Sequence, residues 1–152
     1  AALTHGDGTI ITLSIHMARG WPLDGHPVLS DGRPNPSFIP SDIDIPTAAG
    51  EENEYNARLV EGLFRLASRG RPDLAVVVSG ADPYEKDALA STQQLKLNRE
   101  QLMQRDRSVY DFLDRAKIPV AYLMAGGYGP HAWEVYTQFL LEVLPERYGG
   151  KS

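Results

Sequence analysis

Two loops that follow predicted apolar strands carry the side chains best placed for chemistry. One strand, predicted over residues 74–79, is followed by a glycine and then by Asp82. The other, predicted over residues 120–124, is followed by two glycines and Tyr128. Ligands bind at the carboxyl ends of strands in open α/β sheets, so a carboxylate and a phenol at neighbouring strand ends predict a cleft. The alternative is that both loops are ordinary connections between a strand and a helix.

Several side chains are of the types that bind a divalent metal, namely Asp7, Asp82, Asp87, His5 and His16. Because cysteine is absent, a zinc site here would need at least three His and carboxylate ligands. No His-Glu-x-x-His motif or other closely spaced ligand set occurs, so separated strand ends would have to supply the ligands. The alternative is that His5 and His16 cap turns or make local hydrogen bonds.

Two other catalytic motifs are missing from these loops. The glycines before Tyr128 do not form a phosphate-binding loop, because both the Gly-x-Gly-x-x-Gly pattern and a Lys-Ser/Thr ending are absent. Ser79-Gly80 does not form a nucleophile elbow, because the partner glycine is absent. The lack of cysteine also excludes disulfides, a thiolate metal site and a cysteine nucleophile.

The composition is that of one soluble domain. The 152 residues are 42% apolar and 23% charged, which is ordinary for a globular protein. The net charge of −5 offers no basic surface for nucleic acid, and no apolar run approaches the roughly 20 residues that cross a membrane. The lack of cysteine fits a reducing compartment. We therefore expect a cytoplasmic protein without nucleic-acid or membrane partners. Because its first residue is Ala, we also expect a processed or trimmed chain.

Hydrophobic periodicity predicts strands that alternate with helices. Strands are predicted over residues 10–16, 41–46, 74–79 and 120–124, and helices over residues 51–69, 98–116 and 130–148. Residues 20–40 are rich in proline and glycine and predict a long loop. This order predicts an α/β fold, with three α-β-α layers around a small, mainly parallel sheet of four strands.

The same patterns predict which side chains are buried. The valine-rich strand at residues 74–79 is typical of strands buried on both faces. In the helix at residues 98–116, Arg105 and Asp106 are expected to face water. The last helix is expected to bury a stripe at helical spacing, made of Trp133, Tyr136, Leu140, Val143 and Leu144.

Motifs along nearly the whole chain resemble the C-terminal half of the arginase/histone-deacetylase superfamily, and most closely the bacterial acetoin-utilisation-type and class IV histone deacetylases. The matching segments, in family order, are His5–Thr9, Thr12–His16, Ser41–Pro46, Gly80–Tyr84 with Asp87 and Leu89, Arg105–Arg107 and Ala125–Tyr128. The resemblance implies a truncated arginase/deacetylase-like fold in a single partial domain over residues 1–152. It also implies zinc-dependent hydrolysis, which removes acyl groups from lysine side chains or small amines.

The resemblance assigns roles to individual positions. Asp82 resembles one of the carboxylates that bind the zinc ion. Tyr128 resembles the phenol that donates a hydrogen bond to the substrate carbonyl oxygen as that oxygen becomes an oxyanion. Asp7 resembles the carboxylate that orients a catalytic histidine. Three further positions match binding features of the family. Trp21 resembles an aromatic wall of the acyl-lysine tunnel. Ser14 and the Ile15 carbonyl resemble part of a monovalent-cation site.

Two ligand positions depart from the family pattern. Immediately before its His-Gly-Asp-Gly segment the family carries an Asp and a His that are separated by one residue. Both bind the metal. Ala2 and Thr4 occupy these positions here, and neither is a usual zinc ligand. The tandem His pair that serves the family as general base belongs to an N-terminal half that this sequence does not contain. The segment after Thr9 is also shorter than in the family, which leaves the alignment of residues 1–9 open.

Three functions stay open on this sequence. The first is a zinc-dependent deacylase, and the departures indicate that zinc binding is weak or absent and that activity is lost or impaired in this chain alone. The second is a non-catalytic pseudoenzyme that binds an acyl-lysine or acyl-amine ligand. The third is an assembly module, for which we expect a homodimer, because a valine-rich central strand with an unpaired edge exposes backbone groups and apolar surface.

Overall fold

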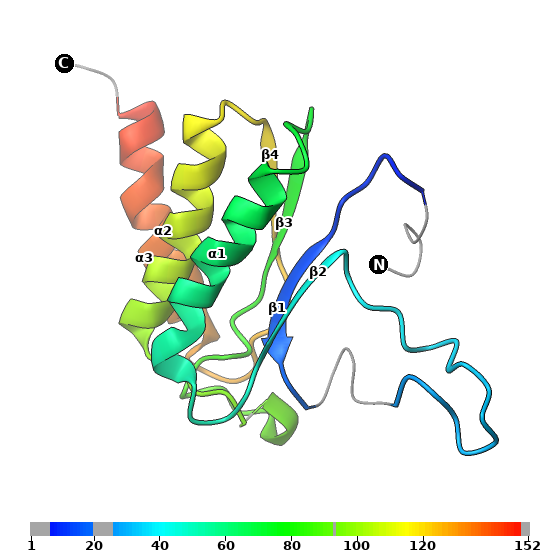
Figure 1. The fold of residues 1–152 in the computed structure, drawn as a ribbon. Helices are drawn as coiled ribbons and strands as arrows, with labels where there is room; N and C mark the ends of the chain where they lie inside the picture. Colours follow the sequence, from blue (N-terminus) through cyan, green and yellow to red (C-terminus); the bar gives the residue numbers. More distant parts are fainter. Residues whose placement is uncertain (1–6, 20–25, 93, 150–152) are drawn as a thin grey trace. The chain divides into compact units, whose positions relative to one another are not determined.

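The computed structural model describes residues 7–19, 26–92 and 94–149 of the 152-residue chain. The elements follow in the order β1 (Leu13–Met17), β2 (Ile43–Thr47), the short 3-10 helix η1 (Glu52–Glu54), α1 (Tyr55–Ala67), β3 (Ala75–Ser79), η2 (Ala90–Thr92), α2 (Arg99–Arg115), β4 (Val120–Met124) and α3 (Ala132–Tyr148) (Figure 1). The chain divides into two compact units, residues 1–70 and 71–152. The prediction of a single domain over the whole chain stays a prediction.

The first unit contains a parallel pair of strands and one helix. In β1 and β2, Ser14 lies opposite Asp44 and Ile15 lies opposite Ile45. Tyr55, Leu59 and Leu63 recur every four residues in α1 and are buried, because this spacing places them on one face of a helix. The apolar face of α1 packs against β2, and the buried Gly62 permits a close approach, since a Cβ atom there would overlap the side chain of Ile45.

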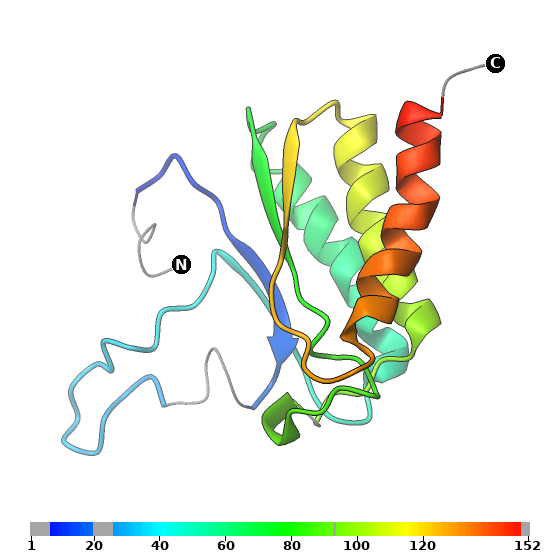
Figure 2. The same cartoon turned by 180° about the vertical axis from the view of Figure 1, so that it is seen from behind.

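The second unit is a β-α-β-α arrangement. Strands β3 and β4 are parallel, with Val77 opposite Tyr122, and α2 connects them (Figures 1 and 2). Asn98 caps the N-terminus of α2: its side chain accepts a hydrogen bond from the Gln101 N–H, while the Gln101 side chain accepts one from the Asn98 N–H. The Phe139 ring of α3 contacts the ring of Tyr122 in β4, with 5.4 Å between the ring centroids. Helices α2 and α3 therefore cover one face of this sheet.

The α/β class with parallel strands is confirmed, but the sheet differs from the prediction. In the described part of the chain the four strands form two separate two-stranded sheets, β1-β2 and β3-β4. The prediction that the valine-rich strand is buried on both faces is wrong, because Val76 is 59% exposed and Val78 is 65% exposed. Strand β2 also continues through Pro46 to Thr47, since a proline at the edge of a sheet costs no hydrogen bond.

Two predictions of side-chain burial in the helices are also wrong. Arg105 and Asp106, expected in water, are 7% and 5% exposed. In α3 the predicted stripe is wrong in part, because Val143 is buried as predicted but Trp133, Leu140 and Leu144 are 64%, 41% and 46% exposed. The other buried positions of α3 are Val135 and Phe139. The reason is that α3 has apolar residues on two flanks, so periodicity alone does not identify the flank that meets the protein core. Among the described residues, no helix combines the length and apolar character needed to cross a membrane.

Candidate functional site

The two strand-end loops of the second unit lie against each other at Asp82. Because Ser79 and Met124 are opposite each other in the parallel pair, β3 and β4 finish at the same edge of the sheet. The Asp82 Oδ1 atom accepts a hydrogen bond from the Gly127 N–H at 3.0 Å. Gly126 has a φ of +79°, and a Cβ atom at this position would overlap the Asp82 carboxylate. The Asp82 side chain therefore packs directly onto the loop that leads to Tyr128.

The backbone of Tyr128 is held by a second carboxylate, that of Asp87. The Tyr128 N–H donates a hydrogen bond to Asp87 Oδ2 at 2.6 Å, and the Tyr128 carbonyl accepts one from the Ala88 N–H at 2.9 Å. Asp87 Oδ1 accepts hydrogen bonds from the Leu89 N–H and the Thr92 hydroxyl, both at 2.9 Å. Asp87 is buried, whereas Tyr128 is 48% exposed. Asp87, which the sequence offered as a possible metal ligand, therefore fixes the backbone from which the Tyr128 side chain projects.

A third side chain, Tyr136 of α3, joins the two loops. Its hydroxyl donates a hydrogen bond to the Gly126 carbonyl at 2.6 Å and accepts one from the Ala81 N–H at 3.2 Å. Burial raises the pKa of the Tyr136 hydroxyl above its ordinary value. The sequence identified Tyr136 only as an apolar-stripe residue. The sequence could have indicated this hydrogen-bonding role, because the hydroxyl of a buried tyrosine needs a hydrogen-bond partner.

A buried ion pair supports the end of β3. The Arg105 guanidinium donates to Asp106 Oδ1 at 2.8 Å, to the Gly80 carbonyl at 2.7 Å and to the Ser79 hydroxyl oxygen at 3.2 Å. The Ser79 hydroxyl in turn donates to Asp106 Oδ1 at 3.0 Å. The guanidinium therefore satisfies the buried carboxylate and also fixes the backbone two residues before Asp82.

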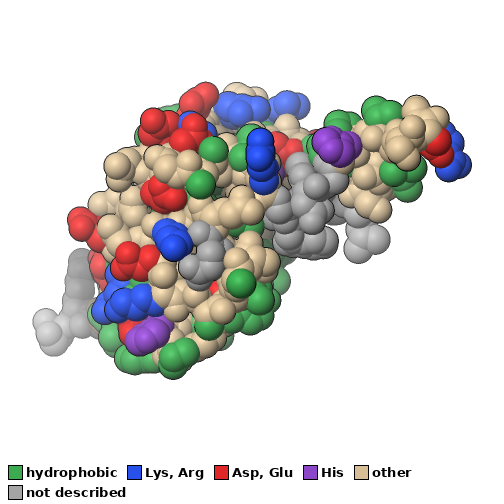
Figure 3. Space-filling model, turned by 90° about the horizontal axis from the view of Figure 1, so that it is seen from below, with side chains coloured by type: hydrophobic (Ala, Val, Ile, Leu, Met, Phe, Trp, Pro, Cys, Tyr) green, Lys and Arg blue, Asp and Glu red, His purple; other side chains and the backbone are tan. Residues whose placement is uncertain are grey.

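A polar chain of three side chains lies beside this site. The Tyr84 hydroxyl donates to Glu134 Oε2 at 2.8 Å, and His131 Nδ1 lies 2.7 Å from Glu134 Oε1. Burial and the neighbouring Glu134 carboxylate raise the pKa of Tyr84 to about 12. The hydrogen bond from His131 lowers the pKa of Glu134 below its ordinary value. Figure 3 looks onto this end of the strands and shows acidic, basic and apolar side chains intermingled there.

The candidate site residues that lie in the first unit make mainly local contacts. Asp7 Oδ1 accepts hydrogen bonds from the N–H and the hydroxyl of Thr9, which hold the pKa of Asp7 below its ordinary value. Ser14 and Ile15 lie within β1. The His16 Nδ1 atom lies 2.7 Å from the Met17 carbonyl oxygen, which is the local hydrogen bond that the sequence allowed as an alternative to metal binding. Trp21, His5, Ala2 and Thr4 lie outside the described residues.

The described side chains do not fit a zinc ion. Across residues 7–19, 26–92 and 94–149, no three His, Asp or Glu side chains gather closely enough to hold a metal. A structural or catalytic zinc site takes three or four protein ligands, and this donor set does not supply them.

Comparison with known proteins identifies the family of the chain. No curated protein matches the sequence at a significant level. The family model described as "Histone deacetylase domain" matches residues 1–144, which is nearly the full length. The matched range contains both strand-end loops of the second unit and the elements that position them. This match, together with the parallel strands and the helices between them, shows that the chain belongs to the histone deacetylase family.

Proposed function

We propose that this chain binds an acylated amine, such as an acyl-lysine side chain, at the strand-end loops of the second unit and does not hydrolyse it. The observation that carries this proposal is the packing of Asp82. Asp82 Oδ1 accepts the Gly127 N–H at 3.0 Å, and the side chain fills the space left by Gly126. Asp82 thereby orders the loop that presents the half-exposed Tyr128.

The family reaction is in general zinc-dependent, and the ligand positions of this chain argue against that chemistry. Ala2 and Thr4 stand where the family pattern has an Asp and a His, so Asp82 is the remaining member of the family's ligand set. One carboxylate holds zinc weakly. Without the metal, neither polarisation of the acyl carbonyl nor activation of a water molecule is available by the family route.

Ligand binding without hydrolysis uses groups that the loops retain. A phenol hydroxyl can donate a hydrogen bond to an acyl carbonyl oxygen, and Tyr128 is the exposed phenol at the strand ends. Its backbone is fixed by two hydrogen bonds, one to Asp87 and one from Ala88. A side chain on a fixed backbone loses less conformational freedom on binding, which favours recognition.

A second candidate is a zinc-dependent deacylase, favoured by the adjacency of Asp82 and the Tyr128 loop. Metal analysis separates the two candidates. After zinc loading and exhaustive dialysis, we expect well under one zinc per chain in the wild type. In the double variant Ala2→Asp/Thr4→His, which restores the two family ligands, we expect zinc retention to rise toward one per chain, and we expect Asp82→Ala to abolish that gain.

The same samples are assayed with an acetyl-lysine peptide. We expect no zinc-dependent release of acetate from the wild-type chain, and we expect saturable binding of the peptide by titration calorimetry. Tyr128→Phe should weaken binding by roughly 5- to 10-fold, because one hydrogen bond contributes about 1 kcal/mol. Stoichiometric zinc together with turnover that is lost in both Asp82→Ala and Tyr128→Phe would establish the deacylase instead.

A further inference from the structure

The backbones of β3 and β4 separate where the two strand-end loops begin. The ladder ends with a long hydrogen bond, in which the Ala125 N–H donates to the Ser79 carbonyl at 3.5 Å. If the strand register continued, Ala81 would lie opposite Gly126. In the described structure the Ala81 N–H donates instead to a side chain, that of Tyr136 in α3. The loops have therefore moved apart at the position where the next backbone bond would form.

The Tyr136 hydroxyl fills the place of this missing rung. It accepts the Ala81 N–H at 3.2 Å and donates to the Gly126 carbonyl at 2.6 Å. A hydroxyl is both a donor and an acceptor, so one such group can bond an N–H and a carbonyl at the same time. The loop that carries Asp82 is thereby connected to the loop that carries Tyr128.

The first turns of α3 also provide the packing that keeps the loops together. Ala132 precedes Tyr136 by four residues, which places both side chains on one face of the helix. A Cβ atom at Gly127 would lie 3.1 Å from the Ala132 Cβ atom and 2.7 Å from the Ala81 Cβ atom. Gly127 is thus enclosed between the loop after β3 and the start of α3, directly before Tyr128 in the chain.

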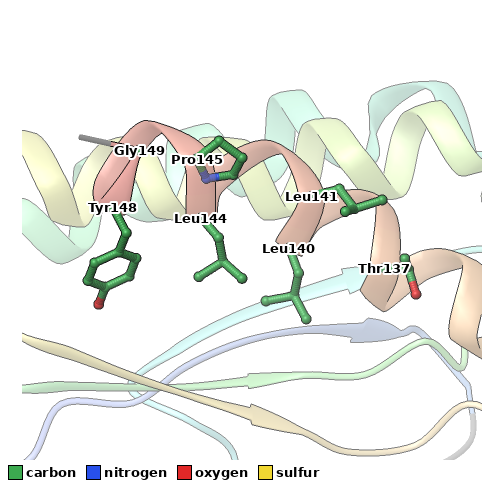
Figure 4. Close-up of a pocket in the computed structure, with 7 residues that line it drawn as sticks. All are labelled: Thr137, Leu140, Leu141, Leu144, Pro145, Tyr148 and Gly149. Atoms are coloured by element: carbon green, nitrogen blue, oxygen red, sulfur yellow. The ribbon is translucent and has the colours of Figure 1, made fainter. Parts of the chain in front are cut away.

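The later turns of α3 carry mainly apolar side chains. Leu140 and Leu144 line a groove there, and Figure 4 shows them projecting from the same side of the helix. An aliphatic side chain offers no hydrogen bond to the backbone of a loop. The polar connection between α3 and the two loops therefore belongs to the beginning of the helix.

We propose that Tyr136 is a positioning residue, whose hydroxyl fixes the spacing between the Asp82 loop and the Tyr128 loop and so strengthens binding at Tyr128 without touching the ligand. The effect on the ligand rests on the proposed function. Without the hydroxyl, the Ala81 N–H and the Gly126 carbonyl lose their common partner. Gly126 is two residues before Tyr128, so its displacement moves the phenol that donates to the acyl carbonyl.

Tyr136→Phe tests the proposal, because it keeps the ring and removes only the hydroxyl. We expect binding of the acetyl-lysine peptide to weaken by roughly 3- to 10-fold, the range of coupling between neighbouring residues. Tyr122→Phe is the matched control. The Tyr122 hydroxyl oxygen is buried and has no hydrogen-bond partner among the described residues, so its removal should leave peptide binding unchanged.

A double-mutant cycle separates positioning from a general loss of stability. If Tyr136 acts through Tyr128, adding Tyr136→Phe to Tyr128→Phe should weaken binding by less than about twofold further, because the group that it positions is already absent. A residue that only stabilises the fold would reduce the affinity of both backgrounds by the same factor.

Hydrogen exchange reports the positioning without any ligand. In Tyr136→Phe we expect the Ala81, Gly127 and Tyr128 amides to exchange at least tenfold faster than in the wild type. The Ala75 amide, which bonds to the Pro119 carbonyl at the other end of the strand pair, is the internal reference and should be unchanged. Tyr122→Phe should alter none of these rates.

The two proposals fail in different ways. A wild-type chain that does not bind the peptide contradicts the proposed function, whereas faster exchange confined to the loop amides still supports the positioning role. Unchanged loop exchange in Tyr136→Phe overturns the positioning role whatever the peptide does. In a chain that binds the peptide, a wild-type affinity in Tyr136→Phe or additive losses in the cycle overturn it equally.

Discussion

Gly126 has a backbone conformation and an environment that both favour glycine. Its φ of +79° lies in the left-handed region, which costs a residue with a side chain about 1 kcal/mol or more. The Asp82 carboxylate also occupies the space that a Cβ atom would need. The loop before Tyr128 and the orientation of Asp82 therefore depend on each other through a single glycine.

This dependence predicts the result of Gly126→Ala. The variant should lower the free energy of unfolding by about 2–3 kcal/mol, from backbone strain and from loss of the Asp82–Gly127 hydrogen bond. It should also weaken peptide binding, because the Tyr128 loop is displaced. Urea denaturation followed by circular dichroism provides the measurement.

Gly50→Ala is the control for backbone strain alone. Gly50 has a φ of +90°, but no atom lies within 4 Å of the position that a Cβ atom would take, so its substitution should cost only about 1 kcal/mol. Equal losses in the two variants would show that packing against Asp82 contributes nothing to stability.

At the scale of the element, α2 does more than cover the sheet. Its Arg105 and Asp106 are buried and connect the helix to the Ser79 hydroxyl and the Gly80 carbonyl at the end of β3. A buried carboxylate without its cation is strongly unfavourable. The position of the Asp82 loop is thus tied to the helix that precedes β4.

We predict that Arg105→Ala lowers the free energy of unfolding by about 3–5 kcal/mol, because Asp106 would remain buried without its cation. Arg115→Ala on the same helix is the control, since the Arg115 side chain is 83% exposed and its loss should change stability by less than about 0.5 kcal/mol. Chemical denaturation of both variants measures the difference. A small loss in the double variant Arg105→Ala/Asp106→Ala, relative to Arg105→Ala alone, would confirm that the unpaired carboxylate is the cause.

At the scale of the whole molecule, each of the two units has its own buried side chains. Residues 71–152 contain β3, β4, both covering helices and every hydrogen bond described around Asp82 and Tyr128. A unit with its own core can fold as a separate domain. The contacts that position Asp82 and Tyr128 therefore all come from the second unit.

We expect the isolated fragment 71–152 to fold cooperatively, with helical circular dichroism and a single thermal transition. Its Arg105→Ala variant should unfold at a lower temperature than the fragment itself, as in the full chain. A fragment that is disordered in buffer would show that the second unit needs residues 1–70 to fold.

The sequence by itself determined the elements and the family. The strand at residues 120–124 was predicted with the bounds observed, and the predicted start of α2 at residue 98 coincides with the Asn98 cap. Such features depend on neighbours in the chain, through alternation, helical spacing and capping, and can be read locally. The strand-end motifs around Asp82 and Tyr128 likewise carried the family resemblance without any knowledge of their contacts.

Tertiary structure decided which faces are covered and which polar groups meet. Val76 and Val78 have the side chains of a buried strand but are exposed, because burial requires a partner layer that a strand's own sequence does not specify. Arg105 and Asp106 have the side chains of a solvated helix face but are buried, because Ser79 and Gly80 supply partners from 25 to 27 residues away. The link from Tyr136 to the backbone of residues 81 and 126 is equally non-local. Side-chain type sets what a residue can bind, but only the folded chain brings the partner within hydrogen-bond distance.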